Sequence, residues 1–356
     1  MKYSGAEAFR LWVVDEAKWA RLCDLWKQMG VTVVRTSSLA GSLKWQSPVG
    51  LYKDLLMRLQ GLLHERGIKH AVMPAAYYYW ADASDYAMGA WKSNVINNVN
   101  GEQDKWIAAC SDYISQIQPD VWYVANEFVL HQEDIDIQTY RAFLARCIRA
   151  YHKIKPDLIC VVMGFPFTDL KPLLNAGGIN EPNTVYDLHY YYNLRGGVPA
   201  SYDNVGNAYY NATTPQQLDD AKQLFYSYLD NNAGVSLAKS LGKDLWFSEI
   251  GTVRLNPNYY QFMVDAFDYM QSRKIGFAPF MSASEGDSAN LPSYPTQVFN
   301  FDFTELNEIG ILASKYMGLP EPESAGGNNF LFWSLLGAFG IVSIVLLASM
   351  GRKKDE

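Results

Sequence analysis

The sequence predicts an α/β fold, a single (β/α)8 TIM barrel followed by a C-terminal transmembrane helix. The main observation is that short apolar runs alternate eight times with longer amphipathic segments within residues 1–318, which is the order of elements in a barrel of parallel strands. A second observation is that long connections follow the strands and short ones follow the helices. The third is a final uncharged apolar run at residues 330–350.

The predicted strands are short runs rich in β-branched and aromatic residues, and the predicted helices carry apolar residues at helical spacing. In chain order, we expect strands at residues 9–14, 31–35, 70–74, 121–126, 158–163, 185–189, 245–249 and 275–280. We expect helices at residues 17–29, 52–66, 102–117, 138–154, 216–241, 259–272 and 305–317. Gly30, Pro119 and Pro156 support three of the helix ends, because glycine readily closes a helix and proline cannot continue one.

A doubly wound open sheet is the alternative fold. Such a fold carries a glycine-rich turn after its first strand, but the chain there reads Asp15-Glu16-Ala17-Lys18. Long aromatic segments at residues 77–100 and 190–214 follow the third and sixth predicted strands, whereas the helix-to-strand links are tight. A barrel with its working face at the carboxyl ends of the strands has this asymmetry.

The C-terminal segment differs from the rest of the chain. Residues 330–350 contain apolar and small side chains without a charge, and as a helix rising about 1.5 Å per residue they match the thickness of a bilayer core. Basic side chains in residues 351–356 predict a cytoplasmic tail, which places the large domain 1–318 outside. We expect residues 319–329, rich in proline, glycine and asparagine, to be a flexible linker.

The start of the chain conflicts with an outward-facing domain. Residues 1–8 contain no apolar segment that could act as a signal peptide. We expect a truncated start, because the alternative, a tail-anchored protein with a cytoplasmic domain, would have to translocate the basic tail.

Composition limits the possible partners and cofactors. The net charge is −7, with 30 Lys and Arg against 37 Asp and Glu, and the sequence contains no basic stripe. Both features argue against nucleic acid as a partner. The five histidines form no HExxH or HxH pair, so we expect neither a metal nor another cofactor. The four cysteines lack CxxC spacing and fall within predicted helices or strands, which indicates buried free thiols; they are Cys23, Cys110, Cys147 and Cys160.

Two glutamates stand at the ends of buried strands. Glu127 follows the fourth predicted strand, and Glu249 ends the seventh. An unpaired buried carboxylate is costly, so an acid in such a place usually lies at the rim of the sheet, where chemistry takes place. The fourth and seventh strands face each other across a barrel, so the two carboxyls could approach the separation of about 5 Å that retaining glycosidases use. The alternative for each glutamate alone is a strand-end salt bridge.

On these residues the chain resembles clan A glycoside hydrolases, most closely family 5, the cellulase and mannanase type. The resemblance covers roughly residues 9–317, and its strongest elements are Asn126-Glu127 and Glu249. It implies that Glu127 is the acid/base and Glu249 the nucleophile of a retaining mechanism.

The resemblance extends to residues around this pair. Arg35 resembles the family's arginine that orients the nucleophile. Asn126 resembles the asparagine that bonds the sugar 2-hydroxyl. His189 and Tyr191 resemble the His-x-Tyr of the sixth strand, whose tyrosine hydroxyl donates to the nucleophile.

Two positions depart from the family pattern. The family has a histidine at the end of the third strand, where this chain has Pro74 followed by two alanines, and the hydroxyl of Tyr77 or Tyr78 could substitute. The family's tryptophan after the eighth strand is replaced by Phe280 or Met281. Both changes alter the sugar-binding subsite, so we expect Tyr77 and Phe280 to contact substrate, and the identity of the sugar stays open.

Together these inferences predict a membrane-anchored, outward-facing retaining β-glycoside hydrolase that is endo-acting on β-1,4-glucan or β-mannan. Its expected partners are an oligo- or polysaccharide and, through residues 330–350, the lipid bilayer. Two other functions stay open. One is a barrel that binds carbohydrate without cleaving it, and the other is a transglycosylase that remodels cell-surface glycans.

Overall fold

The computed structural model describes residues 4–7, 16–38, 49–74, 92–126, 135–165, 168–192, 204–252, 257–279 and 306–317. The chain divides into two units, Met1–Gly318 and Leu319–Glu356. Every described residue belongs to the first unit, so the linker 319–329, the membrane helix 330–350 and the tail 351–356 stay predictions. No helix within the described ranges is long and apolar enough to cross a bilayer.

Eight parallel strands form one sheet whose order follows the sequence, as the barrel prediction requires. They are β1 (Gly5–Glu7), β2 (Val33–Ser38), β3 (Lys69–Pro74), β4 (Val121–Tyr123), β5 (Ile159–Met163), β6 (Thr184–Tyr192), β7 (Asp244–Thr252) and β8 (Gly276–Pro279). A parallel bridge between Ser4 and Phe277 brings β8 back to the start of β1. The predicted (β/α)8 barrel is therefore confirmed.

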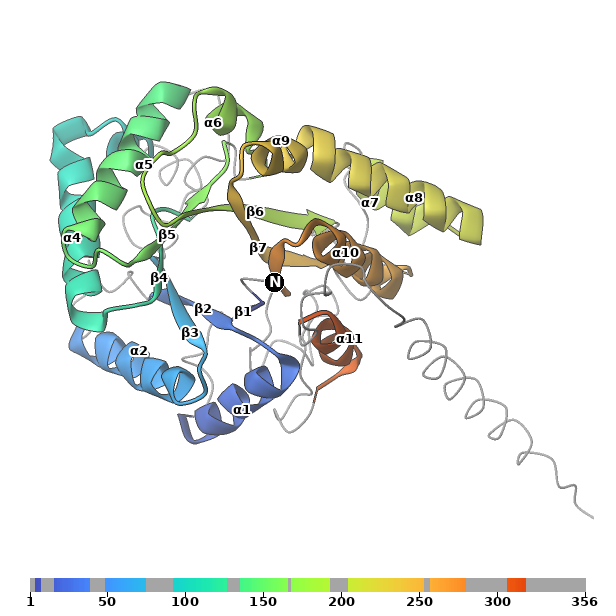
Figure 1. Ribbon diagram of the computed structural model, residues 1–356, viewed down its shortest axis with the longest axis horizontal. Helices are drawn as coiled ribbons and strands as arrows, with labels where there is room; N and C mark the ends of the chain where they lie inside the picture. Colours follow the sequence, from blue (N-terminus) through green and yellow to red (C-terminus); the bar gives the residue numbers. More distant parts are fainter. Residues whose placement is uncertain are drawn as a thin grey trace, which may run out of the picture. The chain divides into compact units, whose positions relative to one another are not determined.

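Helices surround the strands in Figure 1. They are α1 (Trp19–Met29), α2 (Val49–His64), α4 (Glu102–Ile117), α5 (Ile137–His152), α6 (Lys171–Asn175), α7 (Asn204–Asn211), α8 (Pro215–Ser227), α9 (Val235–Ser240), α10 (Tyr259–Arg273) and α11 (Glu308–Met317), with short 3-10 turns at Glu16–Lys18 and Val99–Gly101. The predicted helix at 216–241 is broken, because a π-helical turn at Tyr228–Asn232 ends α8 and Gly234 adopts a φ of 82° before α9. The short helices α6 and α7 were not predicted.

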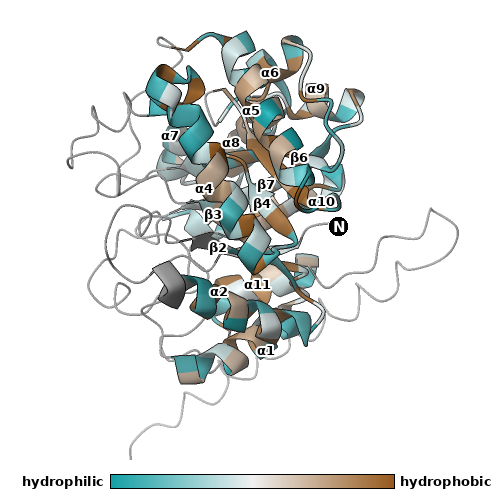
Figure 2. Ribbon diagram, turned by 90° about the vertical axis from the view of Figure 1, so that its left-hand side faces the viewer, coloured by the Kyte–Doolittle hydropathy of each residue, from teal (hydrophilic) through white to brown (hydrophobic). Residues whose placement is uncertain are grey.

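Side chains along the strands alternate between the inside of the barrel and the layer beneath the helices. The inner cluster consists of Val33, Ala71, Met73, Val121, Tyr123, Val161, Val185, Trp246 and Ala278. The larger outer cluster contains the neighbouring strand residues, such as Val34 and Trp122, together with the buried faces of the helices. Helices α1 and α2 accordingly show alternating hydrophobic and hydrophilic bands in Figure 2. Two positions beyond inward-facing Val33 and Val185, the interior becomes charged at Arg35 and Asp187.

The first strand lies earlier in the chain than predicted. It is Gly5–Glu7 instead of residues 9–14, and residues 8–15 lie outside the described part. A Cβ atom at Gly5 would lie 2.8 Å from the indole of Trp246 and 2.9 Å from the Cβ of Ala278. The indole fills the barrel beside β1, so this strand needs a glycine there and carries no apolar run that a pattern could detect.

The prediction of buried free thiols is confirmed. All four cysteines are buried and unbridged, in α1, α4, α5 and β5. Burial raises the pKa of Cys23 and Cys110 to about 12. These groups therefore remain neutral thiols that fill the core.

Candidate active site

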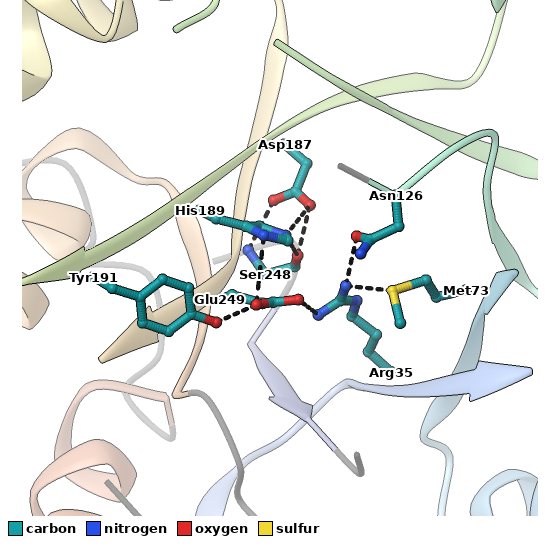
Figure 3. A network of polar contacts seen from close by, with 8 residues as sticks. All are labelled: Arg35, Met73, Asn126, Asp187, His189, Tyr191, Ser248 and Glu249. Carbon is teal, nitrogen blue, oxygen red and sulfur yellow. Dashed lines mark hydrogen bonds and ion pairs between the residues drawn. The ribbon is translucent and has the colours of Figure 1, made fainter. Parts of the chain in front are cut away.

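Polar residues from three strands meet inside the barrel, as Figure 3 shows. Arg35 comes from β2, His189 and Tyr191 come from β6, and Glu249 comes from β7. Asn126, which follows β4, joins them through Arg35. The structure thus brings together five of the residues that the sequence predicted for one site.

Two of these residues lie deeper than predicted. Arg35 is the third residue of β2, not the last, and three more residues of β7 follow Glu249. The reason is that the strands continue to pair beyond the site: β2 pairs with β3 up to Ser38 and Pro74, and β6 pairs with β7 up to Tyr192 and Thr252. The charged groups therefore lie within the barrel wall, below its rim.

Arg35 is the central cation of the site. Its side chain is fully buried. Its Nη1 forms an ion pair with Oε1 of Glu249, and its Nη2 donates to Oδ1 of Asn126 at 2.9 Å and lies against the sulfur of Met73. Its guanidinium carbon lies 4.7 Å from the centre of the Tyr123 ring. A buried guanidinium is tolerated because these contacts replace the water that it has lost.

Glu249 is surrounded by groups that favour its ionised form. Besides the ion pair with Arg35, its Oε2 accepts a hydrogen bond from the Tyr191 hydroxyl and lies 3.4 Å from Nδ1 of His189. Burial alone raises the pKa of this carboxyl. The charges of His189 and Arg35, with the hydroxyl of Tyr191, outweigh burial and hold the pKa of this carboxyl below its usual value. Glu249 is therefore a carboxylate at neutral pH.

A bulge in β7 gives Glu249 its direction. Asp187 and His189 on β6 pair with Trp246 and Glu249 on β7, so β7 has one residue more over this span. The pairing with β8 shows the same extra residue, because Phe247 aligns with Phe277 and Ile250 with Pro279. Side chains of a regular strand alternate, so without this residue Glu249 would face the helices while Trp246 faces the interior. The bulge turns the carboxylate inward.

Asp187 and Ser248 belong to the site but were not predicted. Asp187 accepts a hydrogen bond from the Ser248 backbone nitrogen at 2.9 Å and from the Ser248 hydroxyl at 2.5 Å. The first bond satisfies an amide within the bulge, which holds the irregular backbone in place. Asp187 could have been predicted from the sequence, because side chains two positions apart on a strand point to the same face, and Asp187 lies two positions before His189. No pattern in the sequence marks the bulge at Ser248.

Three predicted site residues lie outside the described residues: Glu127, Tyr77 and Phe280. Their assigned roles stay predictions. Asn126, which directly precedes Glu127 in the sequence, is half-buried and bonded to Arg35. Within the described ranges, no group of three or more His, Cys, Asp or Glu side chains could hold a metal ion.

Comparisons with known proteins agree on the architecture. No protein-family model and no curated protein sequence matches this chain. Among solved structures, the endoglucanase Cel5A of Thermotoga maritima is 13% identical with a TM-score of 0.58, and the match covers 83% of this chain and 89% of that one. The family 5 xyloglucanase of Paenibacillus pabuli is 12% identical with a TM-score of 0.57, covering 84% and 90%.

A third similar structure is the cellulose synthase subunit Z of Clostridioides difficile. It is 14% identical with a TM-score of 0.57, and the match covers 88% of this chain and 99% of that chain. At such identities, the similarity demonstrates a shared fold. The resemblance to family 5 glycoside hydrolases is thereby confirmed at the level of the barrel.

Proposed function

We propose that this protein is a retaining β-glycoside hydrolase in which Glu249 is the nucleophile and Glu127 the acid/base. The observation that carries the proposal is the geometry at Glu249: its carboxyl group lies within the barrel wall, with Arg35 on one oxygen and the Tyr191 hydroxyl on the other, and its surroundings hold its pKa below the usual value. A carboxylate that forms a glycosyl ester must be ionised and held in one direction. The fold supports the same assignment, because structures that share it include cellulases and a xyloglucanase.

The reaction proceeds in two steps. In the first, a carboxylate oxygen of Glu249 attacks the anomeric carbon, the glycosidic bond breaks, and Glu127 gives its proton to the departing oxygen. In the second, Glu127 takes a proton from water while the water oxygen attacks the anomeric carbon, and the carboxylate of Glu249 is released. Two inversions at one carbon leave the sugar with its original β configuration.

Asn126 and Arg35 have separate parts in this mechanism. Asn126 Oδ1 accepts from Arg35, which fixes the orientation of the amide and directs its nitrogen away from the guanidinium. That nitrogen can donate to a sugar hydroxyl, a bond that accelerates the reaction if it strengthens in the transition state. Arg35 does not need to touch the sugar, because its Nη1 binds Glu249 and its Nη2 binds Asn126.

For the substrate, we propose a β-1,4-linked glucan or mannan cleaved within the chain. Similar structures support this class, since T. maritima Cel5A is described in complex with both cellobiose and mannotriose. Hydrolysis of carboxymethyl cellulose and of β-mannan, followed by sizing of the products, tests it. Early release of mixed oligosaccharides supports endo action, whereas release of a single small sugar contradicts it.

The mechanism is tested with Glu249→Ala. Turnover of an aryl β-glycoside should fall by about 10⁴-fold or more because no nucleophile remains. Azide, which fits the space of the missing carboxylate, should restore part of the rate and yield the α-glycosyl azide. Glu65→Ala is the matched control, since Glu65 is exposed in the turn before β3. Full activity of Glu249→Ala would reject the proposal.

The role of Glu127 requires its own variant. Glu127→Ala should lose hydrolysis of natural glycosides but keep the first step on aryl glycosides whose leaving group needs no proton. Azide should then give a β-glycosyl azide. Polysaccharide binding without any cleavage by the unaltered protein would favour a non-catalytic barrel, and transfer to an added acceptor sugar would favour a transglycosylase.

We also propose that residues 330–350 anchor the protein in a membrane with the barrel outside. The support is the uncharged apolar run followed by the basic residues Arg352, Lys353 and Lys354. Flotation with liposomes tests the anchor: the full chain should float, and a chain ending at Gly318 should not. Protease treatment of intact cells tests the orientation, since a barrel protected from the protease would contradict an outward-facing domain.

A further inference from the structure

Asp187 is a fully buried carboxylate within the barrel, next to the proposed nucleophile. Besides its two bonds with Ser248, its Oδ2 lies 3.3 Å from Nε2 of His189. On the other side of the same ring, Nδ1 lies 3.4 Å from Oε2 of Glu249. The imidazole of His189 is therefore placed between two carboxylates, as Figure 3 shows.

The hydrogen bonds of Ser248 determine whether Nε2 of His189 is protonated. The Ser248 hydroxyl gives its only hydrogen to Asp187, so towards His189 its oxygen can act only as an acceptor. Nε2 of His189 lies 3.2 Å from that oxygen and 3.3 Å from the Asp187 carboxylate. Both of these neighbours are acceptors, so Nε2 carries a hydrogen.

The contacts of Glu249 determine whether Nδ1 of His189 is protonated. Arg35 donates to Oε1 of Glu249 and the Tyr191 hydroxyl donates to Oε2, so both oxygens of this carboxyl group are held as acceptors, and Oε2 is an acceptor towards the ring as well. A bare Nδ1 would direct its lone pair at this negative oxygen, whereas a protonated Nδ1 forms an ion pair with it. With hydrogens on both nitrogens, the ring of His189 is an imidazolium.

The charge balance of the site leads to the same result. Among the described residues, the ring contacts Asp187 from β6 and Ser248 and Glu249 from β7, while Arg35 from β2 and Tyr191 from β6 bind Glu249. Of these described groups, two carboxylates and one guanidinium leave a negative charge in a buried region. An imidazolium cancels this charge, and a buried cluster of zero net charge is far less costly than a charged one.

We propose that Asp187 is a positioning residue that keeps His189 as an imidazolium against Glu249, and that this charge assists both steps of glycoside cleavage. The kinetic part of this inference rests on the proposed function. In the first step, the imidazolium helps Glu249 to remain ionised. In the glycosyl-enzyme, Glu249 is an uncharged ester and the site has a surplus positive charge, which favours release of the carboxylate in the second step.

The protonation state can be measured directly by NMR of the full protein with ¹⁵N-labelled histidine. The His189 signals are assigned by their loss in His189→Gln. At about pH 8, above the ordinary histidine pKa of about 6.5, we expect imidazolium shifts for both ring nitrogens. A neutral tautomer of His189 in the unaltered protein would overturn the inference, and this result does not depend on how any other variant folds.

Two variants separate charge from packing. Asp187→Asn keeps the size of the side chain but removes its charge, and the His189 ring should become neutral at about pH 8. Ser248→Ala removes a hydroxyl but leaves both carboxylates, and the ring should remain an imidazolium. An imidazolium that persists in folded Asp187→Asn would overturn the role of Asp187.

Kinetics test the second step. The substrate is an aryl glycoside with a leaving group good enough that breakdown of the glycosyl-enzyme limits the rate. On it, Asp187→Asn should lower kcat by about 10²-fold and lower KM as well, because the intermediate accumulates. A lower kcat with an unchanged or raised KM would indicate that the substitution disrupts the active site in general, and would contradict the proposal. If the unaltered protein cleaves no β-glycoside, the proposed function fails, while the NMR result still decides the charge of His189.

Discussion

Arg35 on β2 and Glu249 on β7 form a buried ion pair between side chains that are 214 positions apart in the sequence. The arginine side chain has no exposed surface, and that of the glutamate is 9% exposed. Both charges are therefore largely withdrawn from water while the barrel stays folded. Removal of one partner therefore leaves the other charge buried and uncompensated, which costs more than the pair itself contributes.

A double-mutant cycle should reveal this dependence. Arg35→Met and Glu249→Met should each lower the free energy of unfolding by about 3–5 kcal/mol. The double variant should be more stable than the sum of these effects predicts, by at least about 1 kcal/mol. Urea-induced unfolding measures all four proteins. The control is the same cycle at the exposed pair Arg149 and Glu181, where coupling should stay below about 1 kcal/mol.

The hydroxyl of Tyr191 should set the acidic limb of the pH–rate profile. It donates to Glu249, whose pKa lies below its usual value. Tyr191→Phe removes this donor, so the pKa of Glu249 should rise and the acidic limb of kcat/KM should move up by about one pH unit. Tyr226→Phe is the control, because that hydroxyl donates to the backbone of Asp265 in the helical layer. A limb that stays in place would show that Tyr191 does not contribute to the ionisation.

Much of the barrel could be predicted from the sequence because its strands and helices have different hydrophobic periods. The predicted helix at 102–117 coincides with α4, and the predicted strands overlap β2 to β8. The site could be predicted in outline for a geometric reason. Parallel strands present their carboxyl halves on the same side, so Arg35, His189 and Glu249 were expected at the same end of the barrel once their strands were known. The inward direction of Glu249 depends in addition on the bulge in β7.

The remaining features depend on contacts between distant residues. β1 could not be recognised, because Gly5 is required there by the indole of Trp246 from β7. The bulge at Ser248 is stabilised by the Asp187 carboxylate from β6, so the local sequence of β7 does not reveal it. Gly234 ends a predicted helix because its backbone is left-handed in the folded chain.

Gly5 offers a direct test of packing inside the barrel. A methyl group there would approach Trp246 and Ala278 to within 3 Å, closer than side chains pack, so Gly5→Ala should destabilise the protein by about 1–3 kcal/mol. Gly61→Ala is the matched control, since Gly61 lies within α2 and has no neighbouring atom within 4 Å of an added Cβ. Alanine favours helix, so this variant should be more stable by up to about 1 kcal/mol. Thermal unfolding compares the two, and equal effects would contradict the packing argument.

His70 should make stability depend on pH between neutrality and mild acid. This buried residue of β3 accepts a hydrogen bond at Nε2 from the Thr36 hydroxyl, 2.8 Å away, and its Nδ1 donates to Oε1 of Gln60 at 3.1 Å. The amide nitrogen of Gln60 donates to two backbone carbonyls, so its oxygen must face the ring. The neutral ring is thus fully bonded, and burial lowers the pKa of His70 to about 3 despite the nearby Asp120.

The sign of the effect follows from proton uptake. In the unfolded chain the pKa of His70 is about 6.5. At pH values between about 6.5 and about 3, the ring is therefore protonated in the unfolded state and neutral in the folded state. The free energy of unfolding should therefore fall with decreasing pH, by about 1.4 kcal/mol per pH unit from this group. Relative to His70→Gln, the unaltered protein should lose about 2 kcal/mol of its advantage between pH 7 and pH 5. Urea unfolding at both pH values measures the difference, in which contributions from other groups cancel, and parallel changes in the two proteins would refute the assignment.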